Sequence, residues 1–296
     1  MPRRPAAPSL AGMISRRRLL LGVPVLAAVS CARLGGTTLE QARRWGVLRV
    51  GIAGERPYGY VDARGQVTGA QPEVARAVLA RIGVGGLEAV QVRFDELIPG
   101  LLADQFDLIT AGMTVTSGRC AEVAFSRPDF VALPAFLVPE GNPRGIGTFG
   151  GVARAEVTLA VLGGSVELLY ARAAGVPEDR LRIVDSQSSL FRDVLAGRAQ
   201  VGALTAISLA DELRRYPGAP LEITRPLEPT IDGRTLVPAA AFAARPGETD
   251  LLTAFDAELT ALQASGEWLR IVEPFGLTAA NLPEPGLTTE ELCAPM

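Results

Sequence analysis

Histidine and lysine are both absent from the 296 residues, so every cationic side chain is an arginine. Without histidine there is no His-containing catalytic triad, no imidazole for acid/base catalysis and no imidazole ligand for a metal. A net charge of -3 leaves no basic face, and we expect no nucleic-acid partner. P-loop, G-x-S-x-G and Cys-x-x-Cys patterns are also missing, so we expect no cofactor and no metal.

The N-terminus has the pattern of an export signal, in which arginines at 16–18 precede an apolar run at 19–29. This run is shorter than the ~20 apolar residues of a membrane span, and Pro24 interrupts it. The arginine cluster resembles a twin-arginine export signal, and the four residues that end at Cys31 resemble a lipoprotein cleavage box. We expect residues 1–31 to be a signal peptide, Cys31 to carry a lipid, and the mature protein to be periplasmic or on the outer face of the cytoplasmic membrane.

Cysteine is scarce, and Cys120 and Cys293 are the thiols that remain once Cys31 is assigned to lipid. In an oxidising compartment they predict a disulfide that closes a very long loop, worth roughly 5 kcal/mol in the chain-entropy model. From the spacing alone, two independent buried thiols are about as plausible as a disulfide.

Short apolar runs alternate with segments of helical periodicity, which predicts an α/β fold with mostly parallel sheets. Before residue 134 we expect strands at 47–52, 89–94 and 106–109 and helices at 72–82 and 97–103. After a crossover we expect strands at 157–161, 181–184 and 201–204 and helices at 165–174 and 190–196. Residues 237–243 then recross, and an amphipathic helix follows at 250–265.

This order predicts two lobes joined by a two-segment hinge, with residues 32–138 and 237–296 in the first lobe and 139–236 in the second. Residues 105–111 and 199–205 echo each other, since each follows a predicted helix and ends at a polar step. Both strands are therefore expected to direct their carboxyl ends at a common crevice, where open parallel sheets bind ligands.

Residues 112–119, Gly-Met-Thr-Val-Thr-Ser-Gly-Arg, carry the strongest functional signal of the mature chain. They supply small residues, hydroxyl groups and one guanidinium directly after a buried strand. Backbone N–H groups at Met113 and Thr114 can approach an anion, and Arg119 can hold both oxygens of a carboxylate. Spacing alone slightly favours a capped helix start with a solvated arginine.

The same stretch resembles the polar amino-acid-binding proteins of ABC importers, solute-binding family 3, in which Gly-x-Thr-x-Thr-x-x-Arg holds the ligand carboxylate. Within that family the chain is most similar to ectoine- and hydroxyectoine-binding proteins, through residues 49–53, 57–60, 94, 97–101, 119–120 and 291–293. The resemblance covers most of the mature chain. It implies a two-lobed periplasmic-binding-protein-like fold that closes by hinge motion, performs no chemistry and delivers its ligand to an ABC permease; we expect a monomer.

The resemblance also implies roles for single residues in the first lobe. Arg119, with Gly112, would hold the ligand carboxylate, Glu55 would face the positive end of the ligand, and Tyr58 and Phe94 would stack on it. Without the resemblance, Phe94 is expected in the core, Tyr58 in a surface turn and Glu55 at an exposed strand end.

On the second lobe, Gly164 and Ser165 precede a helix, so their amides can meet the same carboxylate from the other side; a plain N-cap at Ser165 is equally compatible. Thr205 stands where ordinary amino-acid binders place an Asp for the α-ammonium, and Thr114 stands where ectoine binders place a third aromatic. The expected ligand is a small zwitterion of the ectoine type. The alternatives are a polar amino acid, or a cyclic-acid dehydratase activity with Glu55 as the candidate acid/base.

Overall fold

The computed structural model describes residues 36–295 of the chain. The predicted signal peptide and Cys31 lie outside these residues. No helix of the described part is long and apolar enough to cross a membrane.

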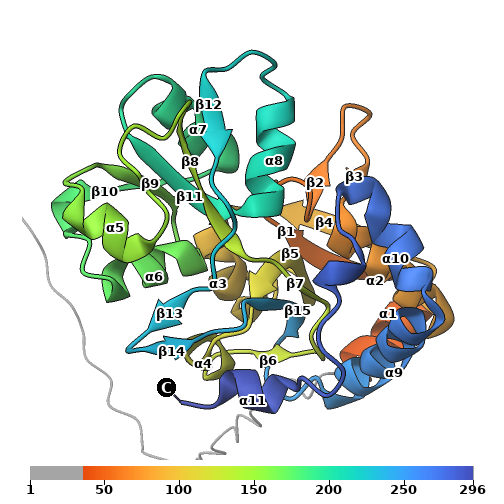
Figure 1. Cartoon of the computed structure of the whole chain (residues 1–296). Coiled ribbons are helices and arrows are strands. Elements are labelled where there is room, and N and C mark those ends of the chain that lie inside the picture. Colours follow the sequence, from red (N-terminus) through yellow and green to blue (C-terminus); the bar gives the residue numbers. More distant parts are fainter. Residues whose placement is uncertain (1–35, 296) are drawn as a thin grey trace, which may run out of the picture. The chain divides into compact units, whose positions relative to one another are not determined.

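The first sheet follows the strand order β4-β1-β5-β15-β6, with β7 also paired to β15 (Figure 1). β1 is parallel to both β4 and β5, whereas β15 runs antiparallel to β5. The strand bounds are Val47–Ile52 (β1), Gly86–Gln91 (β4), Leu108–Thr114 (β5), Ala124–Phe125 (β6), Phe130–Val131 (β7) and Ala239–Ala244 (β15).

Helices α2, α9 and α10 pack against each other and share one buried apolar cluster with this sheet (Figure 1). The predicted amphipathic helix is α9, which buries Leu251, Phe255 and Leu259 and ends at the left-handed Gly266. The bounds of the helices that precede β8 or follow β15 in the chain are Thr38–Trp45 (α1), Ala70–Arg81 (α2), Leu97–Leu102 (α3), Ser117–Cys120 (α4), Thr249–Ser265 (α9), Glu267–Val272 (α10) and Thr289–Cys293 (α11).

The second sheet has the order β10-β9-β11-β8-β12, with β9 parallel to β10 and β11 and with β8 antiparallel to β11. Its strands are Pro134–Pro139 (β8), Leu159–Leu162 (β9), Leu181–Val184 (β10), Val201–Thr205 (β11) and Leu221–Ile223 (β12). Its helices are Phe149–Arg154 (α5), Val166–Ala173 (α6), Gln187–Leu195 (α7) and Ala206–Arg214 (α8). Small hairpins are formed by Tyr60–Val61 with Val67–Thr68 (β2, β3) and by Thr230–Ile231 with Arg234–Thr235 (β13, β14).

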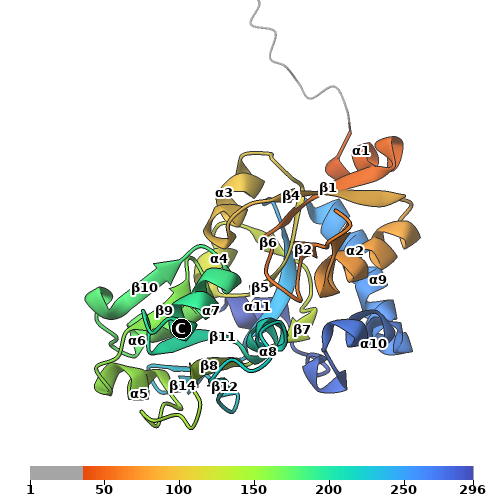
Figure 2. The same ribbon diagram turned by 90° about the horizontal axis from the view of Figure 1, so that it is seen from above.

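Both sheets therefore have the same plan, with three parallel strands followed by one antiparallel strand. This confirms the predicted two-lobed α/β fold, and Figure 2 shows the two sheets side by side from above. The chain passes from the first sheet to the second between β7 and β8, and it returns to the first sheet at β15. The echoed strands, β5 and β11, occupy the same third position in the two sheets.

One predicted boundary needs a correction. Residues 134–138 were assigned to the first lobe, but they belong to β8, which pairs with β11 and β12 of the second sheet. All five residues are buried, because alternate side chains of β8 pack into two different apolar clusters on the two faces of the sheet. The rest of the predicted lobe assignment stays a prediction.

Two segments differ from their predicted bounds. β4 begins three residues earlier than expected, and Phe94 therefore lies in a 3-10 turn, Phe94–Glu96, beyond the carboxyl end of that strand. β5 is longer than predicted because it pairs with β15, so Gly112, Met113 and Thr114 lie in the strand and not in a loop after it.

Candidate functional site

The carboxyl ends of β5 and β11 border a narrow cavity between the two sheets. Eleven residues line it: Glu55, Tyr58, Phe94, Gly112, Thr114, Arg119, Ser165, Val166, Glu167, Leu204 and Thr205. The cavity has a volume of about 20 Å³, roughly the room that one water molecule needs. Its walls have therefore come together, and a ligand of several heavy atoms enters only when they separate.

Most of the predicted site residues lie in this cavity, and two do not line it. The side chain of Met113 is buried in the apolar core beside β5. Gly164 contributes through its carbonyl oxygen, which accepts a hydrogen bond from Arg119. Its φ of 72° and the 2.9 Å between a Cβ placed there and the Cα of Asp95 leave no space for a side chain.

Arg119, in the short helix α4, spans the cavity. Its Nη1 donates to the carbonyl oxygen of Thr114 at 2.6 Å, and its Nη2 donates to the carbonyl oxygen of Gly164 at 2.8 Å. The guanidinium carbon lies 5.5 Å from the ring centre of Phe94. Burial lowers the pKa of Arg119 to about 10, so the group still carries its charge at neutral pH. It is a fixed anion-binding group.

Two carboxyl groups lie in the same cavity. Glu55 is 7% exposed, and burial raises its pKa to about 8, with a hydrogen bond from Ser208 opposing the rise and the neighbouring Glu167 adding to it. Glu167, in the first turn of α6, is 3% exposed, and burial raises its pKa as well. Both groups would be stabilised as carboxylates by a positive charge placed between them.

Glu167 was missed in the sequence, where it follows Ser165 by two residues at the start of a predicted helix. An acidic residue in a first helical turn ordinarily indicates an interaction with the helix dipole, and that pattern carries no signal of a binding site.

Aromatic rings close the cavity on the side of the first lobe. Tyr58 is 2% exposed, stacks on Phe130 with 5.2 Å between ring centres, and shares a 2.6 Å hydrogen bond with Thr205. Gly112 makes room for this ring, because a Cβ at that position would lie 2.9 Å from Tyr58 Cδ2. Thr114 and Thr205 add neutral hydroxyl groups to the lining.

The cavity brings together one anion-binding guanidinium, two carboxyl groups and two aromatic rings, and the charge of Arg119 partly opposes the rise that burial causes in the pKa of Glu167. Such a cavity recognises a small molecule that carries a negative and a positive group at once. Among residues 36–295 no cluster of three acidic or cysteine side chains is placed to hold a metal ion.

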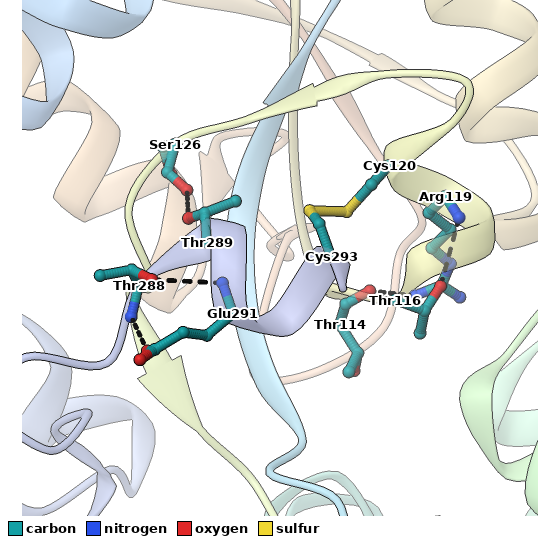
Figure 3. The surroundings of a disulfide bond; sticks show 9 residues. All are labelled: Thr114, Thr116, Arg119, Cys120, Ser126, Thr288, Thr289, Glu291 and Cys293. Carbon is teal, nitrogen blue, oxygen red and sulfur yellow. Dashed lines mark hydrogen bonds between the residues drawn. A yellow bond between two sulfur atoms is a disulfide. The ribbon is translucent and has the colours of Figure 1, made fainter. Parts of the chain in front are cut away.

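The disulfide expected between Cys120 and Cys293 is present and ties α4, which carries Arg119, to the C-terminal helix α11 (Figure 3). A hydrogen bond from Thr289 Oγ1 to the carbonyl oxygen of Ser126 adds a second tie. The short helix α4 is thus anchored by contacts that lie outside the cavity.

The chain belongs to the bacterial extracellular solute-binding proteins of family 3, whose model matches residues 48–278. A probable amino-acid ABC transporter periplasmic-binding protein of Sinorhizobium fredii is 30% identical over 293 residues, 97% of both chains. The L-arginine-binding protein of Pseudomonas aeruginosa is 27% identical over 240 residues, 77% of this chain and 87% of the other.

Among solved structures, the crystal structure of EhuB in complex with hydroxyectoine is similar, with a TM-score of 0.79 and 35% identity over 87% of this chain and 98% of that chain. These comparisons confirm the predicted family. The chain is a solute-binding component of an ABC amino-acid importer, and it acts outside the cytoplasm.

Proposed function

We propose that this protein captures a small zwitterion of the ectoine or hydroxyectoine type between its lobes and passes it unchanged to an ABC permease. The observation that carries the proposal is the position of Arg119 and Glu55 in one cavity with Tyr58 and Phe94. The ligand carboxylate pairs with the guanidinium, and the ring cation lies against the aromatic faces near Glu55. A cation over an aromatic face gains about 0.5 to 2 kcal/mol, depending on desolvation.

Closure of the two lobes around the ligand follows from the fact that each lobe contributes residues to the site. Arg119 comes from the first lobe and already reaches the carbonyl oxygen of Gly164 in the second. A ligand held by Arg119 also meets Ser165 at the N-terminus of α6, so it gains contacts only when the walls meet. Binding therefore favours the closed arrangement by the difference in affinity between the two arrangements.

A polar amino acid is the second candidate, and Glu167 is the observation that favours it. A cationic amino acid brings two positive charges, and the cavity offers two carboxyl groups for them. Thr205 opposes this candidate, since a buried α-ammonium near β11 would have a hydroxyl where a carboxylate is needed.

Catalysis on a cyclic acid would require Glu55 and Glu167 to exchange protons with the ligand. We propose binding without conversion. NMR of a ligand incubated with the protein checks this, because the ligand should be recovered unaltered, whereas a dehydrated product would establish an enzyme.

We also propose that the mature protein is a monomer anchored through a lipid on Cys31. A Cys31→Ser variant should leave the membrane fraction and appear in the soluble extract. Retention of that variant in the membrane would contradict the anchor.

Calorimetric titration with ectoine, hydroxyectoine, L-arginine and L-glutamine tests the ligand class. We expect ectoine or hydroxyectoine to bind with micromolar or tighter affinity, about -8 kcal/mol. Arg144→Ala, which removes an exposed guanidinium away from the cavity, is the matched control and should bind as the wild type does. Tight binding of L-glutamine with no heat from ectoine would overturn the compatible-solute assignment.

A further inference from the structure

Glu167 lines the cavity, but the family resemblance assigns no role to it. It comes from α6 in the second lobe, whereas Glu55 comes from the segment after β1 in the first. Both line the same cavity and both are more than nine-tenths buried, and the charge of Glu167 raises the pKa of Glu55. Each lobe thus contributes one carboxyl group to the lining of the cavity.

The acidic and basic groups of the cavity are unequal in number. Glu55, Glu167 and Arg119 give one more acidic than basic group, and neither carboxyl forms a salt bridge with any residue of the described range 36–295. The guanidinium of Arg119 donates to two carbonyl oxygens instead. Ionising a buried carboxyl group is costly, and burial therefore raises the pKa of both groups, with Arg119 partly opposing the rise for Glu167. A cation that enters between the two groups lowers that cost for both.

We propose that Glu167 is a second specificity-determining carboxylate and that the ligand's cation carries N–H donors on two sides, one for Glu55 and one for Glu167. This inference rests on the proposed function and narrows its ligand class. An amidinium or guanidinium has such paired donors. A quaternary ammonium has none, so zwitterions of that kind are rejected even though the aromatic faces would accept them.

With Glu55 and Glu167 both bound to the cation, the positive end of the ligand also bridges the two lobes. Arg119 and the start of α6 approach the carboxylate from opposite lobes, and Glu55 and Glu167 approach the cation from opposite lobes. A ligand that lacks one of its N–H groups then loses a charge-assisted hydrogen bond that forms only on closure.

A purely structural role for Glu167 predicts something different. Its carboxyl accepts a hydrogen bond from Ser165, the N-cap of α6, and its negative charge lies at the positive end of that helix. If that were its whole role, Glu167→Gln would lower the melting temperature and leave the affinity for ligand unchanged.

The test is calorimetric titration of wild type, Glu167→Gln and the exposed control Glu140→Gln with ectoine, L-arginine and glycine betaine. We expect Glu167→Gln to weaken binding of the amidinium or guanidinium ligand that the wild type accepts by about tenfold or more, with Glu140→Gln unchanged and glycine betaine not bound by the wild type. Affinity within about twofold of the wild type in a folded Glu167→Gln protein would overturn the inference.

A second measurement needs only the wild type. An ectoine derivative methylated on one ring nitrogen keeps the positive charge and loses one N–H, and it should bind about tenfold or more weakly than ectoine. Equal binding would overturn the inference even if the Glu167 variant failed to fold. If Arg119→Ala abolishes binding while Glu167→Gln does not, the inference alone fails; if the wild type binds none of the ligands, the proposed function fails with it.

Discussion

At the scale of single residues, Arg119 is held in place before any ligand arrives. Two of its N–H groups are taken by the carbonyl oxygens of Thr114 and Gly164, and its remaining N–H groups are available for an anion. Because the guanidinium is already ordered, a carboxylate that binds to it does not have to fix a flexible side chain.

Arg119→Ala should therefore reduce ligand affinity by roughly 2 to 5 kcal/mol, since it leaves a desolvated carboxylate without its partner. Arg119→Lys keeps the charge but loses the two-pronged geometry, and it should fall between the wild type and the alanine variant. Calorimetric titration measures all three. Unchanged affinity in Arg119→Ala would remove this residue from the site.

Glu55 predicts a pH dependence of binding with a definite sign. Its pKa is about 8 in the unliganded site, so at neutral pH it carries a proton that must leave before the carboxylate pairs with a cation. Affinity should rise from pH 6 to pH 8 by up to about tenfold per pH unit and then level off. A ligand that does not itself titrate in this range is needed, and Glu55→Gln should bind more weakly with a flatter profile. An affinity that falls as the pH rises would contradict the assignment.

Which of these residues could be predicted depended on whether a motif contained them. Arg119 and Thr114 stand in a recognisable stretch after a strand, whereas Phe94 needed the family resemblance, because an isolated phenylalanine ordinarily indicates core. Glu167 escaped because its position fits a helix start equally well. Met113 was expected to act through its backbone N–H, and that role stays a prediction; its side chain packs in a buried apolar cluster.

At the scale of elements, the four-residue helix α4 is too short to be stable alone. Thr116 caps its start, and Cys120 at its end is joined to α11. The C-terminal helix, itself capped by Thr288 and Glu291, thereby acts as an outer support for the segment that carries Arg119 (Figure 3).

Replacing Cys120 and Cys293 by serine should lower the free energy of unfolding by up to about 5 kcal/mol, because the bond spans 173 residues, although such bonds often contribute less. Denaturant titration with and without a reductant measures this. The reductant should affect the wild type and leave the double variant unchanged.

The same double variant should also bind ligand several-fold more weakly, because α4 loses its outer support. If the effect acts through Arg119, it should disappear in the Arg119→Ala background. An equal loss of affinity in both backgrounds would show that the disulfide acts on the fold in general.

Most elements of the two sheets were predictable from local periodicity, as β1, α2, β10 and α9 illustrate. Elements whose existence depends on distant partners were harder. Residues 134–138 were expected in the first lobe, but the place of β8 is set by its pairing with β11 and β12 of the second sheet. No helix was expected at α11, because its few residues are stabilised by a capping box and a disulfide more than by an apolar face.

At the scale of the whole described unit, direct contacts join the two lobes beside the cavity. The backbone of Arg56 exchanges two hydrogen bonds with the side chain of Gln187, at 3.1 and 2.9 Å. The side chain of Arg56 also pairs with Asp211 at 3.3 Å. These contacts favour the closed arrangement without any ligand atom.

Gln187→Ala should therefore shift the unliganded protein towards an open arrangement without removing a residue that lines the cavity. Small-angle scattering should show a larger radius of gyration for the free variant and a wild-type value after ligand is added. Affinity should fall about three- to tenfold, in proportion to the smaller fraction of closed protein. Gln66→Ala, at an exposed position in the β2–β3 hairpin, should change neither quantity. A free variant as compact as the wild type would contradict this role.

The two-lobed plan was predictable because alternating strands and helices allow few topologies. The small volume of the cavity could not be predicted, because it arises from side-chain contacts between segments far apart in sequence, such as Tyr58 with Thr205.

A crystal structure of the protein grown with hydroxyectoine tests the central claim most directly. The account predicts that the ligand carboxylate lies within hydrogen-bonding distance of the Arg119 guanidinium and that the ring cation lies near Glu55, between Tyr58 and Phe94. A complex in which Arg119 turns towards bulk water, or in which the ligand lies outside this cavity, would contradict it.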